Sequence, residues 1–179
     1  MSRELRLFLA AYPPRPVSER WLVAARGLLP NAVRLTAPDQ VHLTLVFLGD
    51  RNERDLPQIR ESIHRACVGF GPIVLRATGF EMLPARGDPK LLAAMASLPR
   101  SLREMQRRLS DRLAAVKSKR PEFVPHFTLA RFAGKGVARA GQAVDDAEFT
   151  VGEVRLMRSR LIREGALHEL DKAFALQPT

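Results

Sequence analysis

Apolar residues recur along the chain in two spacings, one typical of helices and one typical of strands. The clearest helical pattern covers residues 98–117, where apolar side chains return every three or four positions. Helices are also predicted from a cap at Ser18 to about Leu29, and over 54–68. Short apolar or alternating runs predict strands at 4–11, 32–36, 40–48, 72–80, 89–95, 123–132, 147–157 and 166–174.

The predicted helices and strands mix without a strict strand–helix–strand alternation. This order favours an α+β fold with antiparallel sheets. The length of 179 residues suits a single domain over 1–179, built as one unit or as two small lobes with a shared core. Hydrophobic residues make up 46% of the chain, which is enough to fill such a core.

The charge of the chain points weakly toward nucleic acid. The formal net charge is +10, and 24 of the 29 basic residues are arginine. The planar guanidinium matches phosphate oxygens, so a basic, arginine-rich surface suggests a polyanionic partner. A genome rich in G and C that encodes arginine for surface cations explains the composition equally well. We interpret the arginine-rich face of the 98–117 helix as solvent-exposed rather than as an RNA contact.

Cysteine usage and hydropathy exclude several classes of protein. Cys67 is the only cysteine, so a disulfide within the chain and a cysteine-based metal cluster are excluded. The apolar run at 7–11 is too short for the core of a signal peptide, and no run has the length of a membrane span. We expect a cytoplasmic protein without membrane association, and we find no metal-binding or P-loop pattern that would call for a cofactor.

One short pattern, His-x-Thr-Leu, occurs twice, at 42–45 and 126–129. The chain has four histidines and six threonines, from which random placement predicts only about 0.1 His-x-Thr triplets. A single copy would be read as an ordinary hydrogen-bonded strand residue. The matched pair indicates a shared function.

Strand geometry gives the repeat a meaning. Alternate side chains of a strand point to the same face, so His42 and Thr44 share one face, and His126 and Thr128 share another. A pseudo-two-fold relation between the halves of the chain would bring the two imidazoles and the two hydroxyls around one cleft.

Two histidines and two threonines suit in-line displacement at phosphorus without a metal. Histidine titrates near neutral pH, so one imidazole can accept a proton while the other donates one. Threonine hydroxyls can donate hydrogen bonds to the non-bridging oxygens as charge develops there. A strained five-membered cyclic phosphate is the natural substrate, because its ring opens more easily than a plain diester is cleaved.

Several segments of the chain resemble the two-histidine phosphoesterase superfamily, in its bacterial and archaeal RNA 2′,3′-cyclic phosphodiesterase branch, also called 2′-5′ RNA ligase-like. The matching segments are Arg6-Leu7-Phe8-Leu9-Ala10, residues 38–49, residues 125–131, and Ser159-Arg160-Leu161 followed by Gly165. The likeness spans nearly the whole chain.

The resemblance implies a bilobal α+β fold, in which two antiparallel sheets face each other across a central cleft with helices outside. It implies hydrolysis of a terminal 2′,3′-cyclic phosphate of RNA to a 2′-phosphomonoester. Some relatives also join tRNA halves through a 2′-5′ linkage, the same chemistry in reverse. The expected partner is therefore RNA with a cyclic phosphate end, tRNA halves included, and the expected state is a monomer without metal.

The resemblance also implies roles for single residues. His42 is expected to donate a proton to the departing 3′ oxygen, and His126 to accept one from water. Thr44 and Thr128 are expected to bind the phosphate, with Arg131 as a cation near the phosphate or base. Strict alternation from His126 turns Arg131 away from the cleft, so its role requires a strand end or a bulge.

Three further residues, His168, Phe8 and His64, are assigned structural roles. His168 stands where the family usually has an aromatic residue, most often tyrosine, and we interpret it as a packing residue rather than a substrate contact. Phe8 is more readily explained as core than as a platform for a nucleobase. His64 is expected on a helix surface.

Two other functions are compatible with the same motifs. A related two-histidine enzyme could act on a small cyclic phosphate, such as an ADP-ribose cyclic phosphate. The chain could also be a non-catalytic RNA-binding module. The intact histidines and threonines argue against the module, since a pure binder gains nothing from a matched acid–base pair.

Overall fold

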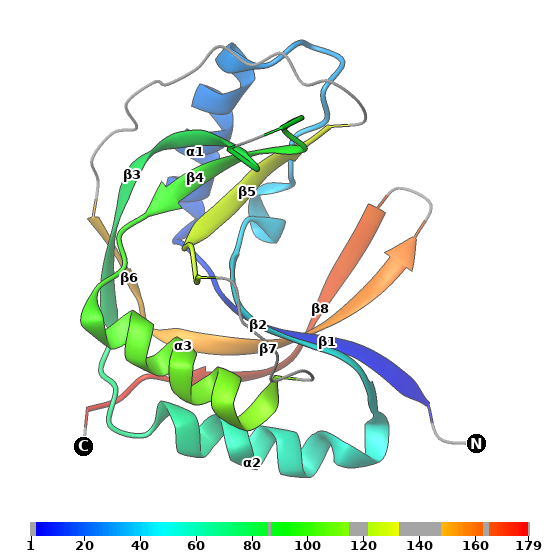
Figure 1. Ribbon diagram of the computed structural model, residues 1–179, viewed down its shortest axis with the longest axis vertical. Coiled ribbons are helices and arrows are strands. Elements are labelled where there is room, and N and C mark those ends of the chain that lie inside the picture. The colour runs from blue at the N-terminus through cyan, green and yellow to red at the C-terminus, as the bar shows by residue number, and fades with distance from the viewer. Residues whose placement is uncertain (1–2, 86, 115–121, 133–147, 163–164, 179) are drawn as a thin grey trace.

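The chain folds around an antiparallel sheet (Figure 1), and the computed structural model describes residues 3–85, 87–114, 122–132, 148–162 and 165–178. The strands are β1 (Glu4–Ala11), β2 (Leu43–Asn52), β3 (Ile73–Leu83), β4 (Leu91–Ala96), β5 (His126–Arg131), β6 (Glu148–Val151), β7 (Glu153–Ile162) and β8 (Gly165–Ala175). The helices are α1 (Arg15–Leu28), α2 (Leu56–Cys67) and α3 (Arg100–Leu113), with 3-10 turns η1 (Pro38–Gln40) and η2 (Glu53–Asp55).

Most predicted elements are confirmed, but the first helix begins earlier than expected. α1 starts at Arg15, and Pro14 occupies the cap position assigned to Ser18. The Ser18 hydroxyl instead donates to the backbone carbonyl of Arg15 at 2.9 Å. Prolines at this end suit a first turn, because their fixed φ is helical and their missing N–H has no partner there anyway.

Other boundaries also shift. The strand predicted at 32–36 contributes only an isolated bridge between Leu35 and Ala130, and the strand predicted from residue 40 begins at Leu43 because η1 precedes it. The run predicted at 147–157 divides at Gly152 into β6 and β7. The predicted end of the third helix, residues 115–117, lies outside the described residues, as does residue 147.

The predicted α+β class is confirmed, with one difference in the sheets. The strands form a single sheet in the order β6-β3-β4-β5-β2-β1-β7-β8. In the described part of the chain, its two four-stranded halves are joined by the pairing of β5 with β2, where Leu43 is aligned with Phe127. The two sheets expected from the resemblance are therefore the halves of one strongly curled sheet (Figure 1).

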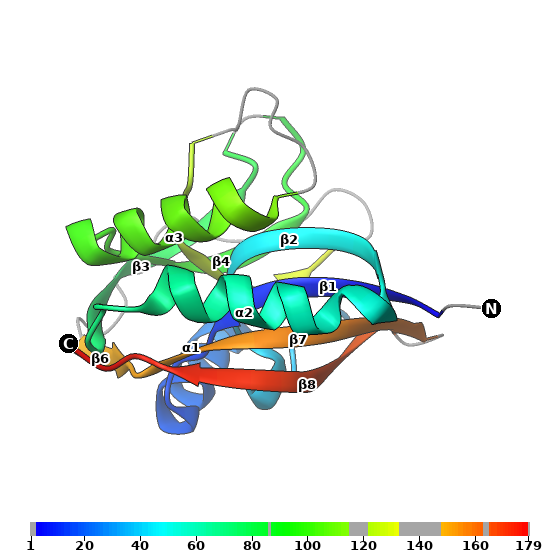
Figure 2. The ribbon, with the colours of Figure 1, turned by 90° about the horizontal axis from the view of Figure 1, so that it is seen from below.

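The helices cover one face of this sheet and bury its apolar side chains. Trp21 of α1 contacts Phe127 at a centroid distance of 5.1 Å and Phe149 at 5.5 Å. α3 packs on β2 and on α2, which in turn contacts β8; Figure 2 shows α2 and α3 side by side. None of the helices in the described ranges is long and apolar enough to cross a membrane. Among the residues that the structure describes, no helix covers the opposite face of β2 and β5 (Figure 1).

Candidate active site

The two His-x-Thr motifs lie directly beside each other in the sheet. Their middle residues, Leu43 and Phe127, are opposed in the antiparallel pair of β2 and β5, and both are buried. Because neighbouring residues run in opposite directions in such a pair, the histidine of each motif lies across from the threonine of the other. The four polar side chains emerge together on the face without helices. They are His42, Thr44, His126 and Thr128.

Matching hydrogen bonds orient the two imidazoles. Nδ1 of His42 bonds the backbone carbonyl of Gln40 at 2.7 Å, and Nδ1 of His126 bonds that of Val124 at 2.9 Å. A carbonyl can only accept, so Nδ1 carries the proton in each ring and Nε2 is the nitrogen available for chemistry. Neither Nε2 has a hydrogen-bond partner within the described ranges.

A β-bulge follows each motif and decides which later residues reach the site. On β2 the pairing with β1 skips Leu45, and on β5 the pairing with β4 skips Leu129. One extra residue reverses the alternation, so the residue three positions after each threonine returns to the site face. These residues are Phe47 and Arg131. The bulge that a site role for Arg131 requires is therefore present.

Arg131 and Phe47 give the two halves of the site different chemistry. Burial chiefly, and in addition the positive charge of Arg131, lowers the pKa of both His42 and His168, so Arg131 makes this part of the site more positive. Phe47 is 66% exposed, and its ring lies 6.0 Å from that of Phe8. One half thus presents a cation and the other an exposed aromatic ring.

His42 is enclosed by three other rings. The centroid of its imidazole lies 5.1 Å from that of Phe8, 5.6 Å from that of Tyr12 and 5.0 Å from that of His168. This burial lowers the pKa of His42 to about 4, against the opposing effect of its bond to the Gln40 carbonyl. Positive charges nearby add to the effect of burial. In the unliganded protein His42 is therefore neutral at neutral pH.

The structure also places Phe8, His64 and His168. Phe8 is 2% exposed and packs with Ala10 and Met157, which confirms it as a core residue beneath the site. His64 is exposed on α2, as expected. His168 packs as predicted, on Phe8 at 4.7 Å, but it also lies against His42 within the site.

Sequence reasoning missed Tyr12, Gln40 and Phe47. No local pattern marks either Tyr12, which meets His42 only through the fold, or Gln40, whose backbone carbonyl two residues earlier accepts from His42. Phe47 did carry a signal, because it stands 84 residues before Arg131, the same offset that separates the two motifs. Aligning the two halves of the chain beyond His-x-Thr-Leu would have assigned both residues to one face.

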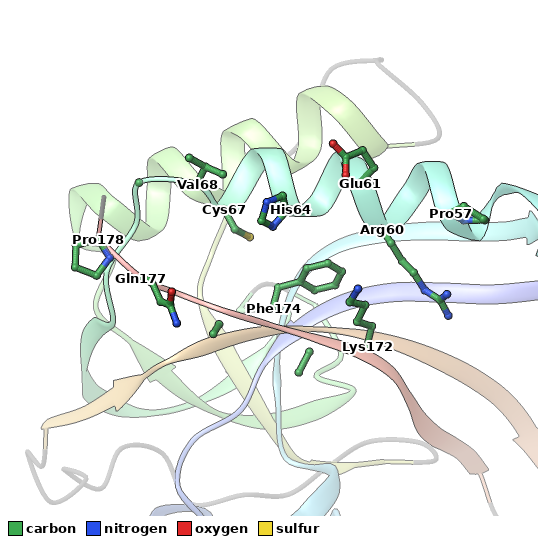
Figure 3. A pocket seen from close by; sticks show the side chains of 13 residues that line it. Pro57, Arg60, Glu61, His64, Cys67, Val68, Lys172, Phe174, Gln177 and Pro178 are labelled. Carbon is green, nitrogen blue, oxygen red and sulfur yellow. The ribbon is translucent and has the colours of Figure 1, made fainter.

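A sizeable cavity lies away from the two motifs. It has a volume of about 690 Å³ and is bounded by α2 and β8 (Figure 3). Its walls include Arg60, His64 and Lys172, and no residue of either motif. Within the described part of the chain, no three His, Cys, Asp or Glu side chains are grouped closely enough to hold a metal ion. The candidate active site is the open, polar face around the two histidines.

Fold and site together define a class of protein. An α+β fold that presents two pseudo-symmetric His-x-Thr motifs on one sheet face is that of a two-histidine phosphoesterase. The sequence matches the 2′-5′ RNA ligase superfamily over residues 13–162, and the chain belongs to this family. The resemblance inferred from the motifs is thereby confirmed.

Individual relatives agree with this assignment. A Thermus thermophilus protein named RNA 2′,3′-cyclic phosphodiesterase is 28% identical, and the match covers 97% of this chain and 91% of that protein. A protein of the same name from Methanothermobacter thermautotrophicus is 28% identical over 80% of this chain and 83% of its own length. The crystal structure of Escherichia coli LigT complexed with NADP+ matches with a TM-score of 0.82 at 25% identity, covering 97% of this chain and 99% of LigT.

Proposed function

We propose that this protein hydrolyses 2′,3′-cyclic phosphates at RNA ends to 2′-phosphomonoesters. The observation that carries the proposal is the direct pairing of the two motifs at Leu43 and Phe127, which gathers two imidazoles and two hydroxyls on one face. The names of the relatives from Thermus and Methanothermobacter support the same reaction.

The proposed reaction uses both histidines through Nε2. His126 accepts a proton from water as the water oxygen bonds to phosphorus, and the bond from phosphorus to the 3′ oxygen breaks. His42 donates a proton to that departing oxygen, so the product is a 2′-phosphate and a free 3′ hydroxyl. Thr44 and Thr128 donate hydrogen bonds to the non-bridging oxygens, and Arg131 offsets their negative charge.

The donor role requires that His42 gain a proton when substrate binds. Its pKa is lowered to about 4 in the empty site, mainly by burial. The phosphodiester brings a negative charge against the ring, which favours the charged imidazolium and raises the pKa of His42. Proton uptake is therefore part of substrate binding in this proposal.

RNA rather than DNA is the proposed partner, because only a ribose 2′ hydroxyl can form the cyclic ester. Phe47 offers an exposed ring beside the site on which a terminal nucleobase can stack. Run in reverse, the same chemistry would join RNA ends, such as tRNA halves, through a 2′-5′ linkage. Independence from metal, a monomeric state, a cytoplasmic location and a single domain over 1–179 remain predictions that accompany this proposal.

One assay tests the reaction. The protein is incubated with an oligoribonucleotide that ends in a 2′,3′-cyclic phosphate, with a chelator present, and the product is identified as a 2′- or 3′-monoester. We expect the 2′-monoester, and we expect His42→Ala and His126→Ala each to lower kcat by about 10²–10⁴-fold. A 3′-monoester would show that the bond from phosphorus to the 2′ oxygen breaks instead, and it would contradict the proposed direction of ring opening.

Two controls separate the proposal from its alternatives. A small ADP-ribose cyclic phosphate, assayed in parallel, identifies a small-molecule enzyme if it is turned over much faster than the oligoribonucleotide. RNA binding without any turnover by the unaltered protein identifies a binding module instead. His64→Ala, a change at an exposed histidine outside the site, is expected to retain full activity.

A further inference from the structure

His168 enters the site from the far edge of the sheet. It lies on β8 opposite Ser159 of β7, and the curl of this hairpin brings its ring to 4.7 Å from Phe8 and 5.0 Å from His42. Any aromatic residue at this position could make the same ring contacts. A histidine differs from other aromatic residues in its two ring nitrogens, which can form hydrogen bonds.

The two nitrogens of His168 have different surroundings. Nδ1 is buried and has no hydrogen-bond partner. A buried N–H without an acceptor is among the rarest features of native proteins, so the proton is expected on the other nitrogen. Nε2 is not enclosed in this way and has no partner among the described residues. His168 therefore presents an unpaired N–H donor beside His42.

The charges around this donor favour an anion. Burial and then the positive charge of Arg131 lower the pKa of His168, so the ring stays neutral and donates as a plain N–H. The two carboxylates of β8 already pair with arginine side chains. Glu169 accepts from Arg160 at 3.3 Å, and Asp171 accepts from Arg60 at 2.9 Å. A hydrogen-bond donor that lies near a positive charge and has no acceptor among the described residues is suited to bind an anionic oxygen.

We infer that His168 is a third imidazole of the active site, a substrate-binding residue whose Nε2–H donates to an oxygen of the phosphoryl group held over His42 and His126. The inference rests on the proposed function for the identity of the ligand as a phosphate ester. It assigns His168 to binding and leaves the proton transfers to the other two histidines.

Amide substitutions distinguish the two nitrogens. In His168→Gln the amide nitrogen reaches the region of Nε2, whereas in His168→Asn it reaches only that of buried Nδ1. His168→Phe keeps a ring against Phe8 and His42 but has no donor. The measurements are the affinity for inorganic phosphate by calorimetry, and kcat and KM for an oligoribonucleotide with a cyclic phosphate end.

We expect His168→Phe and His168→Asn to weaken phosphate binding and raise KM by roughly 10-fold, with kcat changed less than about twofold, as for one lost hydrogen bond. His168→Gln is expected to stay within about threefold of the unaltered protein in both quantities. His64→Phe, the same change at an exposed histidine on α2, is the matched control and should alter neither.

Other outcomes overturn the inference. Unchanged phosphate affinity and KM in His168→Phe would make His168 a packing residue only, and equal losses in the Gln and Asn variants would show that the ring matters rather than the N–H. A protein without turnover whose phosphate affinity still depends on His168 would end the proposed function and leave this inference standing. Thermal unfolding of each variant tests whether a loss of phosphate affinity results from a loss of folded structure.

Discussion

The two motif histidines share the same local hydrogen bond but not the same neighbourhood. Each donates from Nδ1 to a backbone carbonyl two residues earlier. Only His42 is surrounded by Phe8, Tyr12 and His168, and this burial lowers its pKa. Pseudo-symmetry thus builds the pair, and the packing of the rest of the chain then makes the surroundings of its two members different.

At the residue scale we predict that the two threonines act equally. Valine has the shape of threonine without its hydroxyl, so Thr44→Val and Thr128→Val should each lower kcat by about 10²-fold or more, the usual effect of removing one donor to a developing oxyanion. Steady-state kinetics on the cyclic phosphate substrate measures this. Thr150→Val, at an exposed threonine of β6, is the control and should keep full activity.

The lowered pKa of His42 also predicts a pH dependence of stability. Its pKa is about 4 in the folded protein and about 6.5 when unfolded, so between these values the unfolded chain binds more protons. Stability therefore falls as pH falls through this window, by roughly 2–3 kcal/mol for this group at pH 4.5 relative to pH 7.5. Urea unfolding of the unaltered protein and of His42→Gln at both values measures it, and parallel losses in the two proteins would contradict it.

At the scale of elements, we expect the two faces of the motif strands to differ. Substitutions on the buried face should affect stability, and substitutions on the site face should affect function. Phe127 is buried against Trp21 and Phe149, so Phe127→Ala should lower the free energy of unfolding by about 3–5 kcal/mol through the cavity it leaves. Phe47 is exposed on the site face of β2. Phe47→Ala should leave stability nearly unchanged but raise KM for RNA by roughly 10-fold, through lost stacking. Denaturation and kinetics on both variants test the division, which a loss of stability in Phe47→Ala would contradict.

At the scale of the whole molecule, an ion cluster around a buried carboxylate links the C-terminal hairpin to α2. The Asp171 side chain is 0% exposed and accepts hydrogen bonds from Arg60 of α2 and Arg158 of β7. A bulge on β8 leaves Asp171 outside the pairing with β7, three residues after His168. The cluster therefore helps to hold the strand that brings His168 into the site.

We predict that breaking this cluster destabilises the protein. Asp171→Asn removes the charge that compensates two arginines and should lower the free energy of unfolding by about 3–5 kcal/mol. Glu169→Gln breaks the exposed pair with Arg160 on the same strand and should cost about 1 kcal/mol or less. Chemical denaturation of both variants compares them, and similar losses would show that burial of the Asp171 pair is unimportant.

Much of this organisation follows from local patterns in the sequence. Apolar periodicity predicts α2, α3 and most strands, because each element must bury one face. The repeated His-x-Thr-Leu identifies His42, Thr44, His126 and Thr128 without any structure. Local patterns fail where two nearby residues could fill the same position. The N-cap of α1 is Pro14, although Ser18 was the predicted cap.

The tertiary structure alone decides which of these residues meet. The pairing of Leu43 with Phe127, the bulges that turn Phe47 and Arg131 into the site, and the approach of His168 to His42 all join residues far apart in the chain. Such contacts arise from the curl and packing of the whole sheet, to which many residues each contribute weakly. A local pattern determines the face on which a side chain lies, and the packing of the complete chain determines what that side chain touches.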